Sequence, residues 1–324
     1  MSHQRPRLPL AQPACSKSFV GRKVLIFGGT GLLGRHLAEA LSARGAVVTI
    51  ASRRPPFARG EERWVCCDIA NVEQVDQAYR RTQPEQVVQL AAALQIACEL
   101  HPELVVGMNL SGTDAVLQGA ARHNVEQVFV ASSFAIYGQL QGELDESRAP
   151  SSTAGLYGCA KWLEERLGAR YGTLHSFQFA ALRYCAVFGP SDAASVGMAQ
   201  VRKRIESTRL GTPTTIAEAS GHEMAQLTYV SDAVDATLAL MSANALHHIE
   251  YNIAGPRENY LSLRDYHAQV ASLFPHTADV TFTGSATSVG QPCIDRLRQD
   301  TGFLPSVSVT DGLRRMYAAE LQVS

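Results

Sequence analysis

The chain has 324 residues, of which 29 are Lys or Arg and 30 are Asp or Glu, so its formal net charge at pH 7 is -1. This balance supplies no basic surface for a phosphate backbone and argues against nucleic acid as the main partner. The longest apolar run, residues 87–98, contains Gln89 and Gln95 and falls short of the roughly 20 residues that a membrane helix needs, so no membrane span is expected.

The start of the chain is polar, contains three prolines before residue 14 and lacks the apolar core of a secretory signal. We therefore expect a flexible N-terminal tail over residues 1–20. The seven cysteines are scattered without CxxC spacing, which predicts reduced thiols and a cytoplasmic protein. His222-Glu223 and His247-His248 have no third ligand at a suitable spacing, so no metal site is expected.

From Lys23 onward, short β-branched runs alternate with segments of helical spacing. The expected strands cover residues 24–27, 47–50, 64–67, 87–90, 128–131 and 251–253, and helices are expected after the first strand, over 72–81 and over 102–123. Nearly continuous apolar strands alternating with helices predict an α/β fold with a Rossmann-type doubly wound parallel sheet.

The alternation changes after the turn Phe188-Gly189-Pro190, where a basic helix is expected over residues 201–208 and is followed by turns rich in Gly, Thr and Pro. We expect a smaller C-terminal substrate lobe there. The predicted division is an NAD(P)-binding domain of residues 21–190 plus 227–256 and a substrate-binding lobe of residues 191–226 plus 257–324.

The first strand runs into a glycine-rich turn in which Gly28, Gly31 and Gly34 have the spacing GxxGxxG. Gly28 permits a tight turn, Gly31 allows a pyrophosphate to approach the backbone, and Gly34 lets the following helix pack close to the strand. The helix N-terminus offers unpaired N–H groups to the anion. Because strand, turn and amphipathic helix occur in that order, the pattern predicts a bound dinucleotide.

The end of the second strand bears on the choice of dinucleotide. An NAD site usually has an acidic side chain there, whereas this chain has Ser52 and Arg53, which can bond to a 2′-phosphate and pair with its charge. We therefore expect NADP, with NAD possible, although Arg53 and Arg54 could also be a solvated loop pair. Asp68, after the third strand, could meet the adenine amino group or cap the helix that begins at Val72.

Three further residues indicate proton and hydride chemistry. Ser133 ends the fifth strand, and Tyr157 and Lys161 have the i, i+4 spacing that puts two side chains on one helix face. An ammonium beside the phenol predicts a tyrosine pKa below its usual value of about 10, so that Tyr157 could exchange a proton with an alcohol or a carbonyl. Lys161 could also hold the nicotinamide ribose, and Ser133 would hydrogen-bond the substrate oxygen. A surface pair on an amphipathic helix is the alternative.

From Lys23 to about Arg314 the chain resembles the extended short-chain dehydrogenases/reductases, the family of UDP-galactose 4-epimerase. Besides the two motifs above, the resemblance is carried by Leu90-Ala91-Ala92, Asn109-Leu110-Ser111-Gly112-Thr113, Leu182-Arg183-Tyr184, Tyr229-Val230-Ser231-Asp232, Asn252-Ile253-Ala254-Gly255 and Gly302-Phe303-Leu304-Pro305.

The resemblance implies a catalytic set of Ser133, Tyr157 and Lys161. It further implies that Leu90 to Ala92 lie along the cofactor, that Asn109 braces the catalytic strand, and that Tyr184 to Val187 lie against the nicotinamide. The cofactor-binding residues expected from the motifs and the resemblance are Gly28, Thr30, Gly31, Leu32, Leu33, Gly34, Ser52, Arg53, Asp68, Ile69, Leu90, Ala91, Ala92, Asn109, Tyr157, Lys161, Tyr184 and Val187.

Several positions depart from the family pattern. Phe134-Ala135 follows Ser133, where dehydratases carry an Asp-Glu pair, so dehydration lacks its acid and base. Ala186 and Ala225 stand where nucleotide-sugar enzymes usually carry an Asn and a diphosphate-binding Arg. Arg202, Lys203 and Arg204 could compensate or form a solvated helix face. These departures predict a substrate other than a conventional nucleotide sugar.

The sequence thus favours an NAD(P)-dependent oxidoreductase that interconverts a carbonyl and a secondary alcohol, on a keto-sugar or a small secondary-metabolite ketone. A sugar-nucleotide epimerase with a tightly bound cofactor uses the same catalytic residues and is the first alternative, and a non-catalytic cofactor-sensing protein is the second. The family commonly dimerises through the helix that bears Tyr157 and the preceding long helix, so a homodimer is expected. Leu163 and Leu167 could serve that interface or pack on the sheet.

Overall fold

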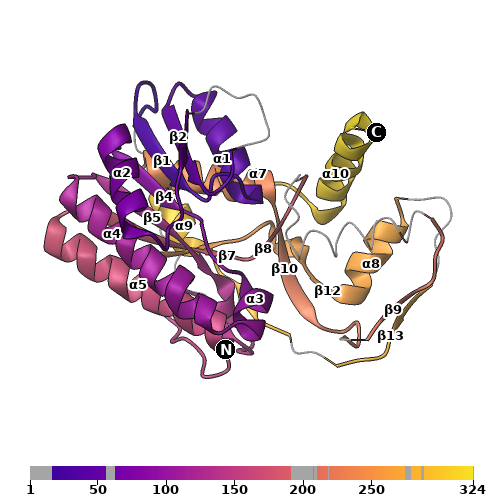
Figure 1. Ribbon diagram of the computed structural model, residues 1–324. Coiled ribbons are helices and arrows are strands. Elements are labelled where there is room, and N and C mark those ends of the chain that lie inside the picture. Colours follow the sequence, from indigo (N-terminus) through magenta and orange to yellow (C-terminus); the bar gives the residue numbers. More distant parts are fainter. Residues whose placement is uncertain are drawn as a thin grey trace, which may run out of the picture.

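A computed structural model describes residues 17–55, 63–190, 207, 210–217, 219–273, 279–285 and 288–323. Its centre is a seven-stranded sheet in which every neighbouring pair is parallel (Figure 1). From edge to edge the strands are β11 (Glu250–Ile253), β7 (Gln178–Tyr184), β5 (Gln127–Ser133), β4 (Gln86–Gln89), β1 (Lys23–Phe27), β2 (Val47–Ser52) and β3 (Arg63–Cys66). Strand order reverses between β1 and β4, as in a doubly wound fold. The predicted fold class is confirmed.

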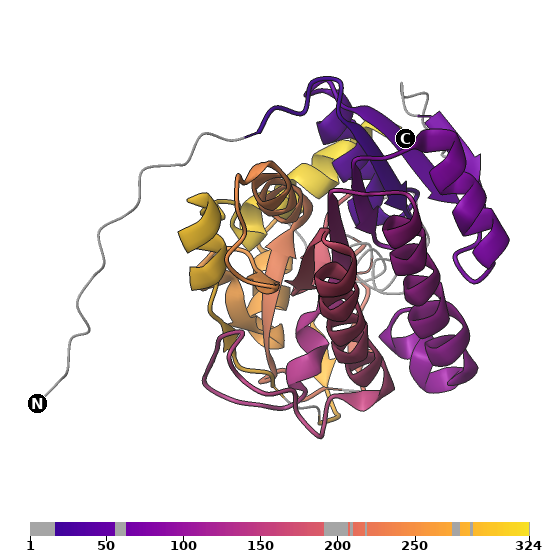
Figure 2. The ribbon, with the colours of Figure 1, turned by 90° about the vertical axis from the view of Figure 1, so that its left-hand side faces the viewer.

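Helices cover both faces of this sheet because neighbouring strand residues point to opposite sides. Val24 and Ile26 of β1 pack in one core with α1 and α7, while Leu25 and Phe27 pack in another with α2 and α4. The helices are α1 (Leu32–Ser42), α2 (Val72–Thr82), α4 (Ser111–Arg122), α5 (Gly155–His175) and α7 (Val230–Ser242). In both views α4 and α5 lie side by side over one face (Figures 1 and 2).

Short elements complete this part of the chain around the carboxyl edge of the sheet. They are α3 (Gln95–Leu100), the π-helical turn η1 (Val105–Leu110), the 3₁₀ turn η2 (Phe134–Tyr137) and β6 (Glu143–Leu144). The helix α9 (Asp295–Thr301) instead packs along β11 and α7. The strand expected from Tyr251 to Ile253 is β11 and pairs with β7, so it closes one edge of the sheet. Of the flexible tail expected over residues 1–20, residues 1–16 lie outside the described residues. Phe19, by contrast, is buried in the core with α1 and α7, and Lys17 N–H donates to the Ser242 carbonyl.

Most of the remaining elements lie beside the sheet, to the right in Figure 1, whereas β14 pairs with β6. The remaining elements are β8 (Ala186–Phe188), β9 (Thr214–Ile216), β10 (Met224–Tyr229), η3 (Arg257–Asn259), β12 (Tyr260–Ser262), α8 (Leu263–Ala271), β13 (Val280–Phe282), β14 (Gln291–Pro292) and α10 (Val309–Val323). The basic helix expected over residues 201–208 falls almost wholly outside the described residues. Within those residues, no helix has the length and apolar character to cross a membrane.

Candidate active site

The glycine-rich turn between β1 and α1 is closely packed on the neighbouring strand. Gly28 has a φ of +79°, and a Cβ on it would lie 2.6 Å from the Ala91 amide nitrogen. A Cβ on Gly34 would meet the Gly28 carbonyl oxygen at 2.5 Å, whereas one on Gly31 would meet only that oxygen, at 3.4 Å. Gly31 thus leaves open space in front of α1, whose N-terminus carries no capping side chain. The turn fits the pyrophosphate of a dinucleotide.

The polar residues at the ends of β2 and β3 make hydrogen bonds within the protein that the sequence does not predict. The Ser52 hydroxyl donates to the Arg54 carbonyl at 2.6 Å and accepts from the Trp64 indole N–H at 3.1 Å, so its hydrogen is already used within the protein. Arg53 is exposed beside it. Asp68 accepts from the Ala70 amide. The cap of α2 is not Asp68 but the next polar residue, Asn71, whose side chain accepts from the amide of Gln74.

The remaining expected cofactor residues differ in their burial and contacts. Thr30, Leu32 and Leu33 are half-buried, as are Leu90, Ala91 and Ala92 beyond β4, while Ile69 is buried against α4. Asn109 is fully buried in η1. Its amide donates to the Ala93 carbonyl at 3.0 Å and its carbonyl accepts from the Ala93 N–H at 2.8 Å. Asn109 therefore holds the chain that follows β4.

Ser133 and Tyr157 meet at the carboxyl edge of the sheet. Ser133 ends β5, and its hydroxyl accepts from the Ala135 N–H at 3.1 Å, at the start of η2. The Ser133 side chain lies close enough to the Tyr157 phenol to help lower its pKa against the larger, raising effect of burial. The helix α5 comes close to η2 at this point because Gly158 has no side chain: a Cβ there would lie 2.7 Å from the Ala135 carbonyl oxygen. The structure therefore places two of the three predicted catalytic residues close together.

Lys161 lies beside Tyr157, with its Nζ 5.8 Å from the centre of the ring. The prediction that Lys161 lowers the pKa of Tyr157 below its ordinary value was wrong. Burial raises this pKa and outweighs the opposing charge of Lys161. The ammonium is instead paired with Glu164, at 2.9 Å, and both side chains are almost fully buried. Burial opposes the charge on Lys161, but this carboxylate more than offsets it and raises the pKa of the lysine.

A cavity of about 480 Å³ opens next to Ser133. None of the described residues that line it carries a charged side chain. They are Gln95, Ser133, Phe134, Ala135, Gly138, Gln139, Thr153, Ala154, Gly155, Tyr184, Cys185, Ala186, Ala225, Gln226 and Val289. Ala186 and Ala225, the two departures from the nucleotide-sugar pattern, thus face one space, on paired strands β8 and β10.

The segment expected against the nicotinamide lies between this cavity and the core. Tyr184 lines the cavity, but its hydroxyl hydrogen-bonds with Thr237 of α7 at 2.7 Å, and burial raises the pKa of the phenol beyond the ordinary range. Val187 packs against the core formed with α1 and α7. Tyr184 therefore lines the site, while its hydroxyl is bonded to α7.

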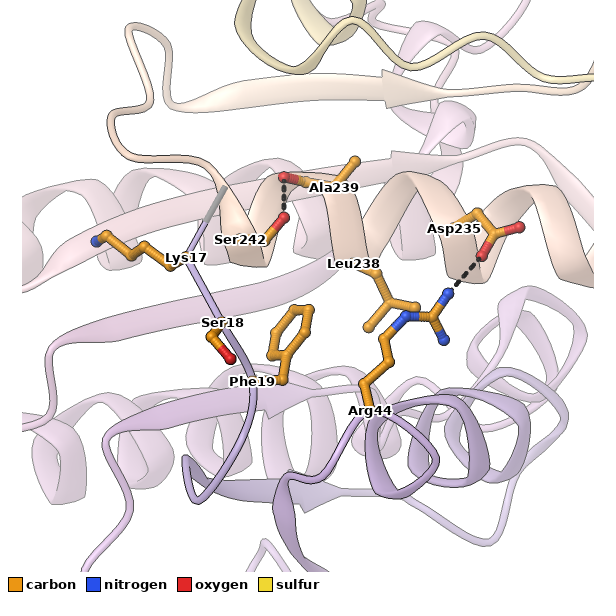
Figure 3. A pocket seen from close by; sticks show the side chains of 8 residues that line it. All are labelled: Lys17, Ser18, Phe19, Arg44, Asp235, Leu238, Ala239 and Ser242. Atoms are coloured by element: carbon orange, nitrogen blue, oxygen red, sulfur yellow. Dashed lines mark hydrogen bonds and ion pairs between the residues drawn. The ribbon is translucent and has the colours of Figure 1, made fainter. Parts of the chain in front are cut away.

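A second hollow of about 460 Å³ lies between α7 and the end of α1, and Figure 3 shows its side chains. Arg44 follows the end of α1 and pairs with Asp235 of α7 at 3.7 Å. Because α1 runs back from the carboxyl edge of the sheet, this hollow is at the opposite edge from Ser133. None of the predicted site residues lines it.

Glu164 is the principal residue that the sequence analysis missed. It lies three positions after Lys161, a spacing at which helix side chains are neighbours, so the pair could have been noticed. The burial of Glu164 could not have been predicted, because it depends on packing against α4, where Thr113 donates to the carboxylate at 3.1 Å. In the described part of the chain, no group of three or more His, Cys, Asp or Glu residues could hold a metal ion.

A comparison of the sequence with models of known protein families gives a match. The model of the NAD dependent epimerase/dehydratase family matches residues 24–254, from β1 to just beyond β11. The chain belongs to this family. It is accordingly an enzyme of NAD-dependent, oxidoreductase-type chemistry, and the predicted resemblance to extended short-chain dehydrogenases/reductases is confirmed.

Individual relatives differ in what they do. The chain is 26% identical to UDP-N-acetyl-alpha-D-glucosaminuronate decarboxylase of Bacillus cytotoxicus, over 90% of this chain and 96% of that protein. UDP-glucose 4-epimerase of Thermotoga maritima, solved with UDP-glucose, has a TM-score of 0.83 at 20% identity, covering 93% of this chain and 99% of the other. A GalE-like L-threonine dehydrogenase of Cupriavidus necator has a TM-score of 0.81 at 22% identity, covering 91% and 99%. Likeness at this level of identity establishes the fold.

Proposed function

We propose that the enzyme is an NADP-preferring oxidoreductase that interconverts a small, uncharged ketone and its secondary alcohol. The observation that carries the proposal is the cavity at Ser133, whose described lining is uncharged, with Tyr157 close to that serine and Lys161 beside the Tyr157 ring. Tyr157→Phe removes the hydroxyl and tests the assignment: it should abolish turnover while dinucleotide binding persists.

Each catalytic residue has a distinct role in this proposal. Ser133 holds the substrate oxygen by a hydrogen bond, and Tyr157 gives that oxygen a proton during reduction or removes it during oxidation. Lys161 stabilises the phenolate that remains after proton donation. The nicotinamide, when bound along the turn of Gly28 to Gly34, supplies or accepts the hydride.

The cavity supports a substrate without a diphosphate. A buried diphosphate needs cationic partners, and the described lining has none. Ala186 and Ala225 leave two short side chains where nucleotide-sugar enzymes usually carry polar ones, whereas Gln95 and Gln226 offer amides to hydroxyl groups. A keto-sugar or a secondary-metabolite ketone is the substrate class that we propose.

The preference for NADP rests on Arg53. It is exposed directly after β2, and no acidic residue occurs at this strand end to bind the ribose hydroxyls of NAD. Ser52 would shape the loop through its bonds to Arg54 and Trp64, since its own hydrogen is engaged. Thermal-shift titration with NADP and NAD tests the preference, and stronger stabilisation by NAD would contradict it.

An epimerase that keeps its cofactor is the second candidate, and the full-length match to enzymes named for UDP-sugar chemistry favours it. The absorbance of reduced nicotinamide distinguishes the two. Consumption of added NADPH in proportion to a ketone supports the reductase, whereas conversion of a UDP-sugar with no net cofactor change supports the epimerase. A non-catalytic cofactor sensor would bind dinucleotide tightly and turn over neither class.

We also propose a cytoplasmic homodimer. The face formed by α3, η1 and α5 exposes the apolar side chains of Leu100, Val106, Trp162 and Leu163, whereas Leu167 packs inward on the sheet. An exposed apolar face of this kind is typical of a subunit interface. Cys66 and Cys159 are exposed thiols, as suits a reducing compartment. Sedimentation velocity tests the dimer.

A further inference from the structure

The carboxylate next to the catalytic lysine is an unusual feature of this site. Glu164 is wholly buried, and its Oε2 lies 2.9 Å from the Lys161 Nζ. Thr113 donates to the same oxygen, and Gln89 in turn donates to Thr113 at 3.5 Å. The second oxygen, Oε1, is buried and has no hydrogen-bond partner among the described residues. A half-satisfied buried carboxylate is costly in folding free energy, which sets this pair apart from surface ion pairs.

The pair changes what Lys161 can do to Tyr157. An isolated ammonium near the phenol would favour the phenolate, because opposite charges attract. With a carboxylate 2.9 Å away, the lysine belongs to a nearly neutral pair, and its field at the phenol is much reduced. Consistent with this, burial raises the pKa of Tyr157, Lys161 only partly opposes the rise, and Glu164 adds to it.

We propose that Glu164 is a positioning residue, which fixes the Lys161 ammonium and offsets its charge so that Tyr157 keeps its proton at neutral pH. The inference rests on the proposed function, since a protonated phenol is what reduction of a ketone requires. As hydride from the reduced nicotinamide forms the new C–H bond, the O–H bond of Tyr157 breaks and its proton goes to the carbonyl oxygen. The phenolate that remains is then stabilised by Lys161.

The groups around Tyr157 and Lys161 indicate that Glu164 is the residue that offsets the charge of Lys161. Apart from Lys161 and Glu164 on its own helix, Tyr157 lies near Cys98 of α3 and Ser133 of β5. The Glu99 carboxylate of α3 accepts from the amide of the preceding residue, Leu156, at 3.1 Å. Burial raises the pKa of the Cys98 thiol, so Cys98 is neutral at pH 7. The other buried carboxylate on α5, Glu165, is paired with Arg183 of β7 at 2.7 Å. Glu164 is thus the carboxylate that acts on the lysine.

The test compares Glu164→Gln with Asp114→Asn, which makes the same chemical change on the neighbouring helix α4, where the Asp114 carboxylate accepts from the Tyr171 hydroxyl at 2.8 Å. Ionisation of Tyr157 is measured in the cofactor-free protein from tyrosinate absorbance, as the difference between each protein and its Tyr157→Phe counterpart. We expect Glu164→Gln to lower the midpoint by about one pH unit or more, because the ammonium is released from its partner. Asp114→Asn should leave the midpoint in place. Equal midpoints in wild type and Glu164→Gln would overturn the proposal, as would equal shifts in both variants.

The pH dependence of catalysis provides a second test. In the reduction direction, the pH above which kcat/KM falls should move down in Glu164→Gln by the same amount as the tyrosinate midpoint. Glu164→Asp, which keeps the charge but draws it back by one methylene, should shift the midpoint in the same direction by less, and serves if the glutamine variant does not fold. Since the tyrosinate titration requires no substrate, failure of the proposed function and failure of this inference remain distinguishable.

Discussion

Arg183 of β7 and Glu165 of α5 form a two-pronged ion pair beneath the site, with Nε to Oε1 at 2.8 Å and Nη2 to Oε2 at 2.7 Å. Both side chains are almost completely buried. The same arginine donates to the Tyr137 hydroxyl at 2.8 Å, and Ser132 of β5 donates to the same carboxylate. This network ties α5 to the two strands beside it. It thereby fixes α5, the helix that carries Tyr157, against the sheet.

Glu165→Ala should lower the free energy of unfolding by about 3–5 kcal/mol, because it leaves the Arg183 guanidinium buried without its partner. Urea denaturation measures the loss. Glu39→Ala is the control: its carboxylate is half exposed, 3.9 Å from Arg35, and its removal should cost at most about 1 kcal/mol. Equal losses in the two variants would contradict the structural role of the network.

Gly31→Ala should separate folding from dinucleotide binding. Its Cβ would meet only the Gly28 carbonyl oxygen, at an ordinary contact distance of 3.4 Å, so the urea midpoint should hardly change. The same methyl group would occupy the space in front of α1 that the pyrophosphate needs, so the dissociation constant for dinucleotide should rise roughly tenfold or more. Gly34→Ala, with an overlap at 2.5 Å, should instead destabilise the fold. Unchanged binding in Gly31→Ala would place the pyrophosphate elsewhere.

The sheet could be predicted from sequence because its strands are short β-branched runs and its turns carry glycine at the required spacing. Val24 and Ile26 face one core while Leu25 and Phe27 face the other, which is why the first strand reads as apolar throughout. The late strand at Tyr251 was likewise foreseen.

What the sequence could not give were contacts between distant residues. Ser52 was assigned to a phosphate, but Trp64, twelve positions later, bonds to its hydroxyl. Asp68 was considered as a cap because it precedes a helix, yet Asn71 is closer to the first turn and takes that role. The pKa of Tyr157 depends on burial, which local spacing with Lys161 does not reveal. In each case the competing partner or the degree of burial is a property of the folded chain.

Arg53→Ala should weaken the binding of NADP by about tenfold, equivalent to about 1.4 kcal/mol, and leave that of NAD within twofold, because only NADP carries the 2′-phosphate. Isothermal titration with both cofactors measures the change. Arg54→Ala, at the neighbouring exposed position, shows whether the effect belongs to one arginine. Equal weakening of NADP and NAD by Arg53→Ala would remove the basis for the proposed preference.

Ala225→Arg should give the cavity a cation where the described lining has none. We expect UDP to bind the variant at least about tenfold more tightly than wild type, since a guanidinium pairs well with a diphosphate. Ala225→Met fills a comparable space without charge and is the matched control. If wild type already bound UDP as tightly as the arginine variant, the proposal of a substrate without a diphosphate would be wrong.

The central claim concerns the hydroxyl of Tyr157, and Tyr157→Phe tests it most directly. Tyr171→Phe is the control on the same helix, because that hydroxyl bonds to Asp114 at 2.8 Å on α4. The measurement is kcat for NADPH-dependent reduction of the best substrate in a ketone panel, with dinucleotide affinity determined in parallel. The account predicts that Tyr157→Phe lowers kcat by about 10²–10⁴-fold while the affinity for NADP stays within twofold, and that Tyr171→Phe remains active. Full turnover by Tyr157→Phe would contradict it.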